Sequence, residues 1–143
     1  MSRAAAAAFH CLIRTHHVTS RKKLRRVRHA ADQHGVERVL VRSGGSPGIM
    51  FAESADENSL IDWVSDVQAL RYKDFRCVAR PAPAQTVAAP CASSGRGPSR
   101  WTGLLKEPGF HETESVTAFG KEMEEGGVAE WWKKAMGYTA QDG

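Results

Sequence analysis

The sequence predicts an α+β fold, in which four short strands form one sheet and two helices pack on one face of it. Two helix patterns and a set of strand-like runs favour this class. Residues 60–70 carry apolar side chains at positions i, i+3, i+4, i+7 and i+10, the pattern of an amphipathic helix. A second, strongly basic helix pattern ends at residue 34. Runs rich in β-branched or alternating apolar residues flank both helices, at residues 9–15, 36–42, 49–53 and 75–80.

The first strand and the first helix occupy residues 9–34. The run FHCLIRT at residues 9–15 is short and apolar, as strands are. The helix begins near Thr19 or Ser20, either of which can cap its free N–H groups, and Gly35 ends it. Apolar residues at helical spacing form only a narrow stripe here, and basic side chains occupy the rest of the circumference. We therefore expect a thinly anchored helix with a strongly charged outer surface.

A hairpin follows the basic helix. Its strands are residues 36–42 and 49–53, and the loop SGGSPG joins them. Consecutive glycines in such a loop allow a backbone anion nest. A hairpin that needs positive φ explains the same glycines without a ligand, and we favour this explanation.

The second helix and the last strand complete the domain. Ser54 and Glu57 match a capping box that starts the helix. Residues 75–80 then alternate as a half-buried strand, which Pro81 stops. The order strand, helix, strand, strand, helix, strand is that of a ferredoxin-like βαββαβ sandwich, an antiparallel sheet with helices on one face.

We predict three parts along the chain. Residues 9–81 are the ferredoxin-like domain, and residues 82–100, rich in Pro, Ala, Ser and Gly, are a flexible linker. Residues 101–138 are a helical appendage that docks on the domain, because two short helices are too small to fold alone. Its apolar residues at helical spacing are Val116, Phe119, Met123, Val128, Trp131, Trp132 and Ala135.

Positive charge is concentrated on the first helix and the hairpin. Residues 21–42 hold eight of the 20 Lys and Arg residues, opposed only by Asp32 and Glu37. A like-charged cluster repels itself, so its concentration on one unit suggests a polyanionic partner such as nucleic acid. A solvated helix face is the other interpretation, and charge alone does not separate the two.

The predicted mode of binding is contact with RNA backbone phosphates. The paired aromatics of an RNA-recognition motif are missing, since the strand IMFAE holds a single aromatic. The arginines and lysines of this region can instead neutralise backbone phosphates. The candidate RNA-binding residues are His16, His17, Ser20, Lys22, Lys23, Arg25, Arg26, Arg42, Gly45 and Gly48.

Other chemistry is not indicated. Cys11, Cys77 and Cys91 are odd in number and lack a C-x-x-C pair, which argues against disulfides and structural zinc and favours a reducing intracellular compartment. Adjacent histidines in an extended segment point in opposite directions, so His16 and His17 do not form a metal site. No catalytic constellation emerges, and we expect neither enzymatic activity nor a cofactor.

The location in the cell stays open between two alternatives. We expect a nuclear or cytoplasmic protein, since no apolar run approaches the roughly 20 residues of a membrane span. Residues 1–31 contain no acidic residue, however, and mitochondrial transit peptides share that composition.

Several motifs between Phe9 and Pro81 are shared with one known family. His-His stands before a Ser-Arg-Lys-Lys helix start, Gly-Ser-Pro-Gly precedes the strand IMFAE, and Leu-Arg-Tyr-Lys-Asp-Phe leads to the last strand. With these motifs the chain resembles the C-terminal domain of Prp-three-type small nuclear ribonucleoproteins, in the version found in fungal RWD-domain-containing proteins. Residues 116–138 also look like the tail of the RWD-linked relatives.

The resemblance implies a ferredoxin-like domain and a role in RNA binding. In the splicing factor this domain contacts paired small nuclear RNAs, so the matching positions Lys22, Lys23, Arg25 and Arg26 become candidate RNA contacts. Only eight residues precede Phe9, and no RWD domain is among them. The chain is therefore expected to be a fragment, a truncated gene model or a minimal paralogue, and splicing itself is not carried over.

A second function stays open beside RNA binding. In this alternative the chain is a protein-interaction module, and Trp131 and Trp132 or the free sheet face engage a partner such as an RWD protein. Exposed tryptophans would favour that function, and a buried pair would favour simple docking of the tail.

Overall fold

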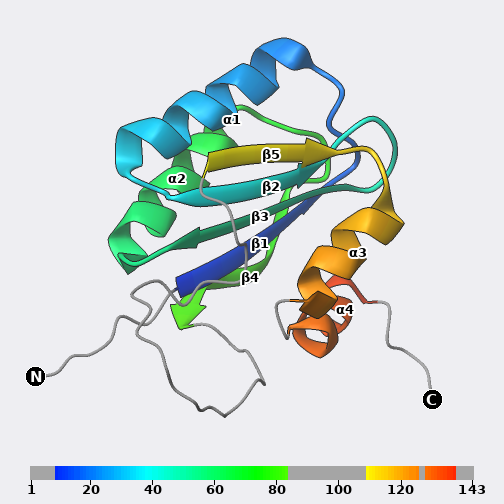
Figure 1. The fold of residues 1–143 in the computed structure, drawn as a ribbon. Coiled ribbons are helices and arrows are strands. Elements are labelled where there is room, and N and C mark those ends of the chain that lie inside the picture. The colour runs from blue at the N-terminus through cyan, green and yellow to red at the C-terminus, as the bar shows by residue number, and fades with distance from the viewer. Residues whose placement is uncertain (1–8, 84–108, 126–127, 138–143) are drawn as a thin grey trace, which may run out of the picture.

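The computed structural model describes residues 9–83, 109–125 and 128–137, and its described part is an α+β fold (Figure 1). The α+β class expected from the sequence is confirmed. One five-stranded sheet carries two helices on each face. The elements are β1 (Phe9–Thr15), α1 (Arg21–His34), β2 (Arg38–Arg42), β3 (Gly48–Ser54), α2 (Glu57–Ala69), β4 (Arg76–Pro83), β5 (Gly109–Thr113), α3 (Val116–Glu125) and α4 (Ala129–Met136). Among the described helices, none is long and apolar enough to cross a membrane.

The sheet is mixed and has the strand order β4-β1-β3-β2-β5. β1 pairs antiparallel with β3 and β4, and β2 pairs antiparallel with β3. β5 is parallel to β2 and was not expected, because the appendage was predicted to be only helical. The run GFHET is too short and polar to stand out as a strand. Backbone pairing with β2 holds β5 in place. Two hydrogen bonds fix its ends: Gly109 N–H donates to the Glu37 carbonyl at 2.8 Å, and Ser43 N–H donates to the Thr113 carbonyl at 2.9 Å.

One face of the sheet packs against α1 and α2. The side chains of Ile13, Val39, Val41 and Met50 meet both helices in a single apolar core. Trp63 of α2 is fully buried in this core, and its indole Nε1 donates to the carbonyl of Val27 on α1 at 3.2 Å. A buried indole N–H needs such a partner, so the bond ties the two helices together.

The other face is covered by α3 and α4 (Figure 1). The face that α1 and α2 leave free is therefore not open to solvent, because the helices of the appendage occupy it. Phe51 is fully buried under this second layer, and Phe119 stacks on Trp132 with ring centroids 5.9 Å apart. Every residue of β3 is buried, as a strand with a core on both sides requires. The apolar stripes of the appendage supply that second core.

The caps of α1 are those the sequence predicts. Ser20 is the N-cap, and its hydroxyl accepts a hydrogen bond from the backbone N–H of Lys23. Gly35 ends the helix in the left-handed region, with φ 75°. A glycine adopts this conformation without strain, which explains why the helix stops there.

The start of α2 differs from the capping box expected at Ser54. Asp56 is the N-cap, and its carboxylate accepts from the N–H of Asn58 at 3.0 Å. Ser54 instead ends β3, is fully buried, and accepts from the N–H of Asp56 through its hydroxyl. The pattern placed the cap two residues early because the strand continues further than its apolar run.

β4 also runs past its expected end. It continues through Pro81 to Pro83, where the sequence predicted a stop and the start of the linker. Proline lacks an N–H but is tolerated in an edge strand, whose outer side needs no ladder bond. The remaining linker residues, 84–100, lie outside the described residues.

The hairpin loop needs two of its glycines for different reasons. Gly44 has φ 96°, so the expected positive φ is present. Gly48 begins β3 and is buried, and a Cβ there would overlap Oγ1 of Thr15 and a methyl group of Val18. The loop glycines thus have structural roles that require no ligand.

We predict that Gly48→Ala lowers the free energy of unfolding by about 1–3 kcal/mol, the usual cost of overpacking a tight site. Urea unfolding followed by circular dichroism measures the change. Ser46→Ala, at an exposed position of the same loop, is the control and should leave the free energy unchanged. Equal stability of the Gly48 variant and the control would contradict the assigned close contact.

Candidate nucleic-acid interface

Three cations and a histidine form a row on the outer face of α1. Lys22, Arg25, Arg26 and His29 occupy positions i, i+3, i+4 and i+7, which lie on one side of a helix. All four side chains are exposed, and with Arg28 and Asp32 they surround a shallow depression. The buried residues Leu24, Val27, Ala30 and Ala31 face the core and so turn this row outward.

Three of these cations are unpaired within the described part of the chain. No ion pair joins Lys22, Arg25 or Arg26 to a described carboxylate. Asp32 is the single acidic residue in α1. We call the exposed side chains of Lys22, Arg25, Arg26 and His29 the α1 cationic surface. It combines like charge with free hydrogen-bond donors, which suits anionic groups of a ligand.

A groove adjoins the α1 cationic surface, between the start of α1 and the end of α2. Ser20, Lys23 and Arg26 line it from α1, and Leu70 and Arg71 line it from the other side. Ser20 caps the helix through its hydroxyl, so its role is structural. Lys23 is half-buried: its Nζ lies 5.1 Å from the centre of the Tyr72 ring and donates to the Arg71 carbonyl at 3.4 Å. Lys23 thus anchors the α2–β4 connection.

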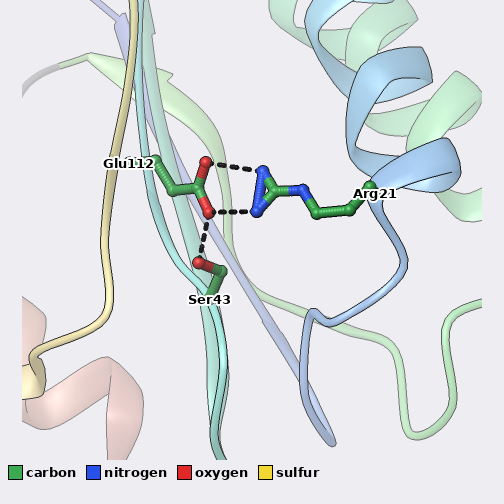
Figure 2. A network of polar contacts seen from close by, with 3 residues as sticks. All are labelled: Arg21, Ser43 and Glu112. Atoms are coloured by element: carbon green, nitrogen blue, oxygen red, sulfur yellow. Dashed lines mark hydrogen bonds and ion pairs between the residues drawn. The ribbon is translucent and has the colours of Figure 1, made fainter.

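Arg21 is neutralised by β5 (Figure 2). Its guanidinium donates both NH1 and NH2 to the Glu112 carboxylate, at 2.9 and 2.8 Å. The Ser43 hydroxyl donates to the same carboxylate. Arg28 lies 5.9 Å from the Phe110 ring centre. β5 therefore engages the flank of α1, while the α1 cationic surface stays open.

The two predicted histidines lie in the loop before α1 and are exposed. Nδ1 of His16 lies 3.6 Å from a carboxylate oxygen of Asp74, and the rings of His16 and His17 are 4.7 Å apart. Among the residues that the structure describes, no group of three or more His, Cys, Asp or Glu side chains has the arrangement of a metal site.

The predicted hairpin residues serve the hairpin itself. Arg42 donates from Nε to the Glu114 carbonyl at 3.0 Å and from NH1 to the Pro47 carbonyl at 3.1 Å. Gly45 packs against this guanidinium, and Gly48 is buried. These contacts hold the loop to the β5–α3 connection. Arg42, Gly45 and Gly48 therefore do not form one open patch with the α1 cationic surface.

Two residues beside the predicted cations, His29 and Arg71, are not among the predicted site residues. His29 follows the same helical spacing as Lys22 and Arg26, so periodicity alone could have included it. Arg71 comes from the end of α2 and has φ 62°. No local pattern places it beside α1, because that proximity arises from tertiary packing.

The described cysteines have the protonation expected of buried thiols. Burial raises the pKa of the Cys11 thiol well above its usual 9.0, and nearby Cys77 raises it further. Burial also raises the pKa of Cys77, although Arg80 lowers it in part. A protonated thiol is a poor nucleophile, so the raised pKa lowers the reactivity of both thiols near neutral pH.

Comparison with known proteins identifies no relative. A scan against protein-family models finds no match to this chain, and a search of curated proteins finds no similar sequence. Functional assignment therefore depends on the residues and their geometry.

We predict that stability falls at high pH and that Tyr72 contributes to the fall. Burial raises the pKa of Tyr72 from 10.0 to about 12, against a smaller opposing effect of Arg21. A group with a raised folded-state pKa stabilises the fold below its unfolded pKa, and this contribution is lost as pH rises toward the folded value. The free energy of unfolding should therefore decline between about pH 10 and about pH 12.

Tyr72→Phe tests the assignment. The Tyr72 hydroxyl is buried without a described hydrogen-bond partner, so its removal should leave stability near neutral pH unchanged or higher. Urea unfolding of both proteins across the alkaline range should show a shallower decline for the variant. Parallel declines would contradict the role of Tyr72.

Proposed function

We propose that this chain is a non-catalytic RNA-binding domain that grips backbone phosphates with the α1 cationic surface. The observation that carries the proposal is the row of exposed, unpaired Lys22, Arg25 and Arg26 on one side of one helix. Cations without carboxylate partners repel one another and oppose folding. A bound polyanion removes that repulsion, and counterion release adds to affinity.

Phosphate contact is a better match to these residues than stacking on bases. Reading RNA bases on a sheet requires exposed aromatic side chains. Phe51, the aromatic that the sequence places in β3, is fully buried. The groove beside Arg71 adds further cations where the α1 cationic surface meets the end of α2, so a phosphate chain has donors along and beside the helix.

We also propose that residues 9–83 form a ferredoxin-like sandwich. Within the sheet, the run β4-β1-β3-β2 is antiparallel and has α1 and α2 on one face, which supports a ferredoxin-like sandwich for residues 9–83. β5, α3 and α4 are then additions to it. The proposal includes the relation to the Prp-three C-terminal domain that the sequence motifs suggest, and a nuclear or cytoplasmic location.

The alternative function, a protein-interaction module built on the tryptophan pair, lacks its main support. Trp132 is 5% exposed and packs against Phe119 and Gly120. Trp131 is half-buried, with its ring 5.9 Å from that of His10 and 6.1 Å from that of Phe51. The pair therefore serves to dock the tail on the chain's own sheet.

We predict that the triple variant Lys22→Glu, Arg25→Glu, Arg26→Glu binds RNA much more weakly while its circular dichroism spectrum is unchanged. Each phosphate that the variant no longer neutralises should reduce the salt slope of log affinity by about 0.7–0.9, so three such phosphates change it by about 2–3. Filter-binding titrations of single- and double-stranded RNA at several salt concentrations measure both quantities. Lys23 is kept, because it anchors Arg71 and Tyr72.

The matched control is Lys121→Glu, Lys133→Glu, Lys134→Glu. It makes the same change in net charge at exposed positions of α3 and α4. It should bind RNA more tightly than the α1 variant. Equal weakening in both variants would mean that only net charge matters, and retained binding by the α1 variant would refute the proposal.

We predict that Glu112→Gln strengthens RNA binding. The substitution frees Arg21 beside the α1 cationic surface and removes a negative charge, so the salt slope should steepen by about 0.7–0.9. The control is Glu114→Gln, since the exposed Glu114 makes no ion pair with a described residue. The same titration should show little change for this control, and identical effects of both variants would argue against masking by Glu112.

A further inference from the structure

A second surface lies along β4, at the opposite edge of the sheet from β5 (Figure 1). β4 pairs with β1 on one side and with no described strand on the other. Pro81 and Pro83 lack N–H groups, so the longest run of β4 residues that all carry a backbone donor is 76–80. An unpaired edge of this length can accept an added strand from another chain.

A groove runs beside this edge, between β4 and α2, with a volume of about 640 Å³. Ile61, Val64 and Gln68 line it at positions i, i+3 and i+7 of α2. Phe75, Arg76 and Arg80 line it from the strand side. No carboxylate is among the groove's described lining residues, so the groove is apolar at its centre and cationic beside the edge.

Ile61 is the feature that a simple protected edge does not explain. It is 47% exposed and is the one exposed large hydrophobic residue in the described part of the chain. Charged residues on an edge strand discourage unwanted pairing, which would account for Arg76 and Arg80. Protection of the edge does not account for Ile61, whose exposed side chain lines the groove. Burial of this side chain by a partner would be favourable.

We propose that the β4 edge and the groove beside it bind an extended acidic peptide segment of another protein. The segment pairs its backbone with residues 76–80 and places an apolar side chain against Ile61 and Phe75. Its carboxylates bond to the guanidinium groups of Arg76 and Arg80. Arg76 and Arg80 are four residues apart in β4, at most about 13 Å, because the pairing of this strand with β1 shifts register twice. A matching segment therefore carries two acidic residues about four positions apart, with an apolar residue between them.

The test uses the full chain and a displayed library of linear heptapeptides as the probe. Selection should enrich peptides that combine two acids with an intervening apolar residue. Synthetic copies of these peptides, measured by fluorescence anisotropy, should bind Ile61→Glu and the pair Arg76→Glu, Arg80→Glu at least roughly tenfold more weakly than the parent chain. Ser65→Glu is the matched control: it adds the same charge to an exposed α2 position that does not line the groove.

Every outcome decides the proposal. Enriched peptides without acids, no enrichment, or unchanged binding to the Ile61 and arginine variants would overturn it. A dimer of the parent chain in sedimentation equilibrium that Ile61→Glu abolishes would overturn it too, because the groove would then hold a second copy. The α1 triple variant should bind the peptides normally, so failure here is distinguishable from failure of the RNA-binding proposal.

Discussion

The cationic helix depends on the burial of a narrow apolar stripe on its inner side. α1 has six Lys and Arg residues and a single Asp among 14 residues, so its charges repel one another. Leu24 and Val27 are the only large buried side chains on it, each contributing about 1.5–3 kcal/mol when fully buried. The bond from Trp63 to the Val27 carbonyl adds a fixed contact to this small area. Burial of the inner side of α1 thus offsets the repulsion between the charges on its outer side.

The second core makes that arrangement possible. With α3 and α4 on the far face, β1 and β3 are buried on both sides, and the sheet packs against a second core to which α1 contributes no residue. The same closure removes the sheet face as a binding platform. The outside of the helices and the sheet edges stay exposed. The two proposed binding surfaces, the α1 cationic surface and the β4 groove, lie there and differ in chemistry.

Residue type and helical spacing predicted the features of α1 that depend on neighbouring residues in the sequence. Capping at Ser20 and Gly35 followed from residue type, and the cations of α1 are exposed because its apolar stripe is narrow. β5 was missed, since a short polar strand is held by its neighbour and not by its own pattern. The contact of Arg42 with the Glu114 carbonyl was not predicted, because 72 residues separate the two in the sequence. Arg71 reaches the interface only through packing of α2 on α1.

Nuclear magnetic resonance mapping of the amide signals during titration with a short RNA duplex, and separately with a single strand, tests the central claim most directly. Phosphate binding by the α1 cationic surface predicts shifts confined to α1 and the neighbouring Arg71–Tyr72 connection, saturating with RNA and reversed by salt. Shifts centred on α3 and α4, or none with either RNA, would contradict it.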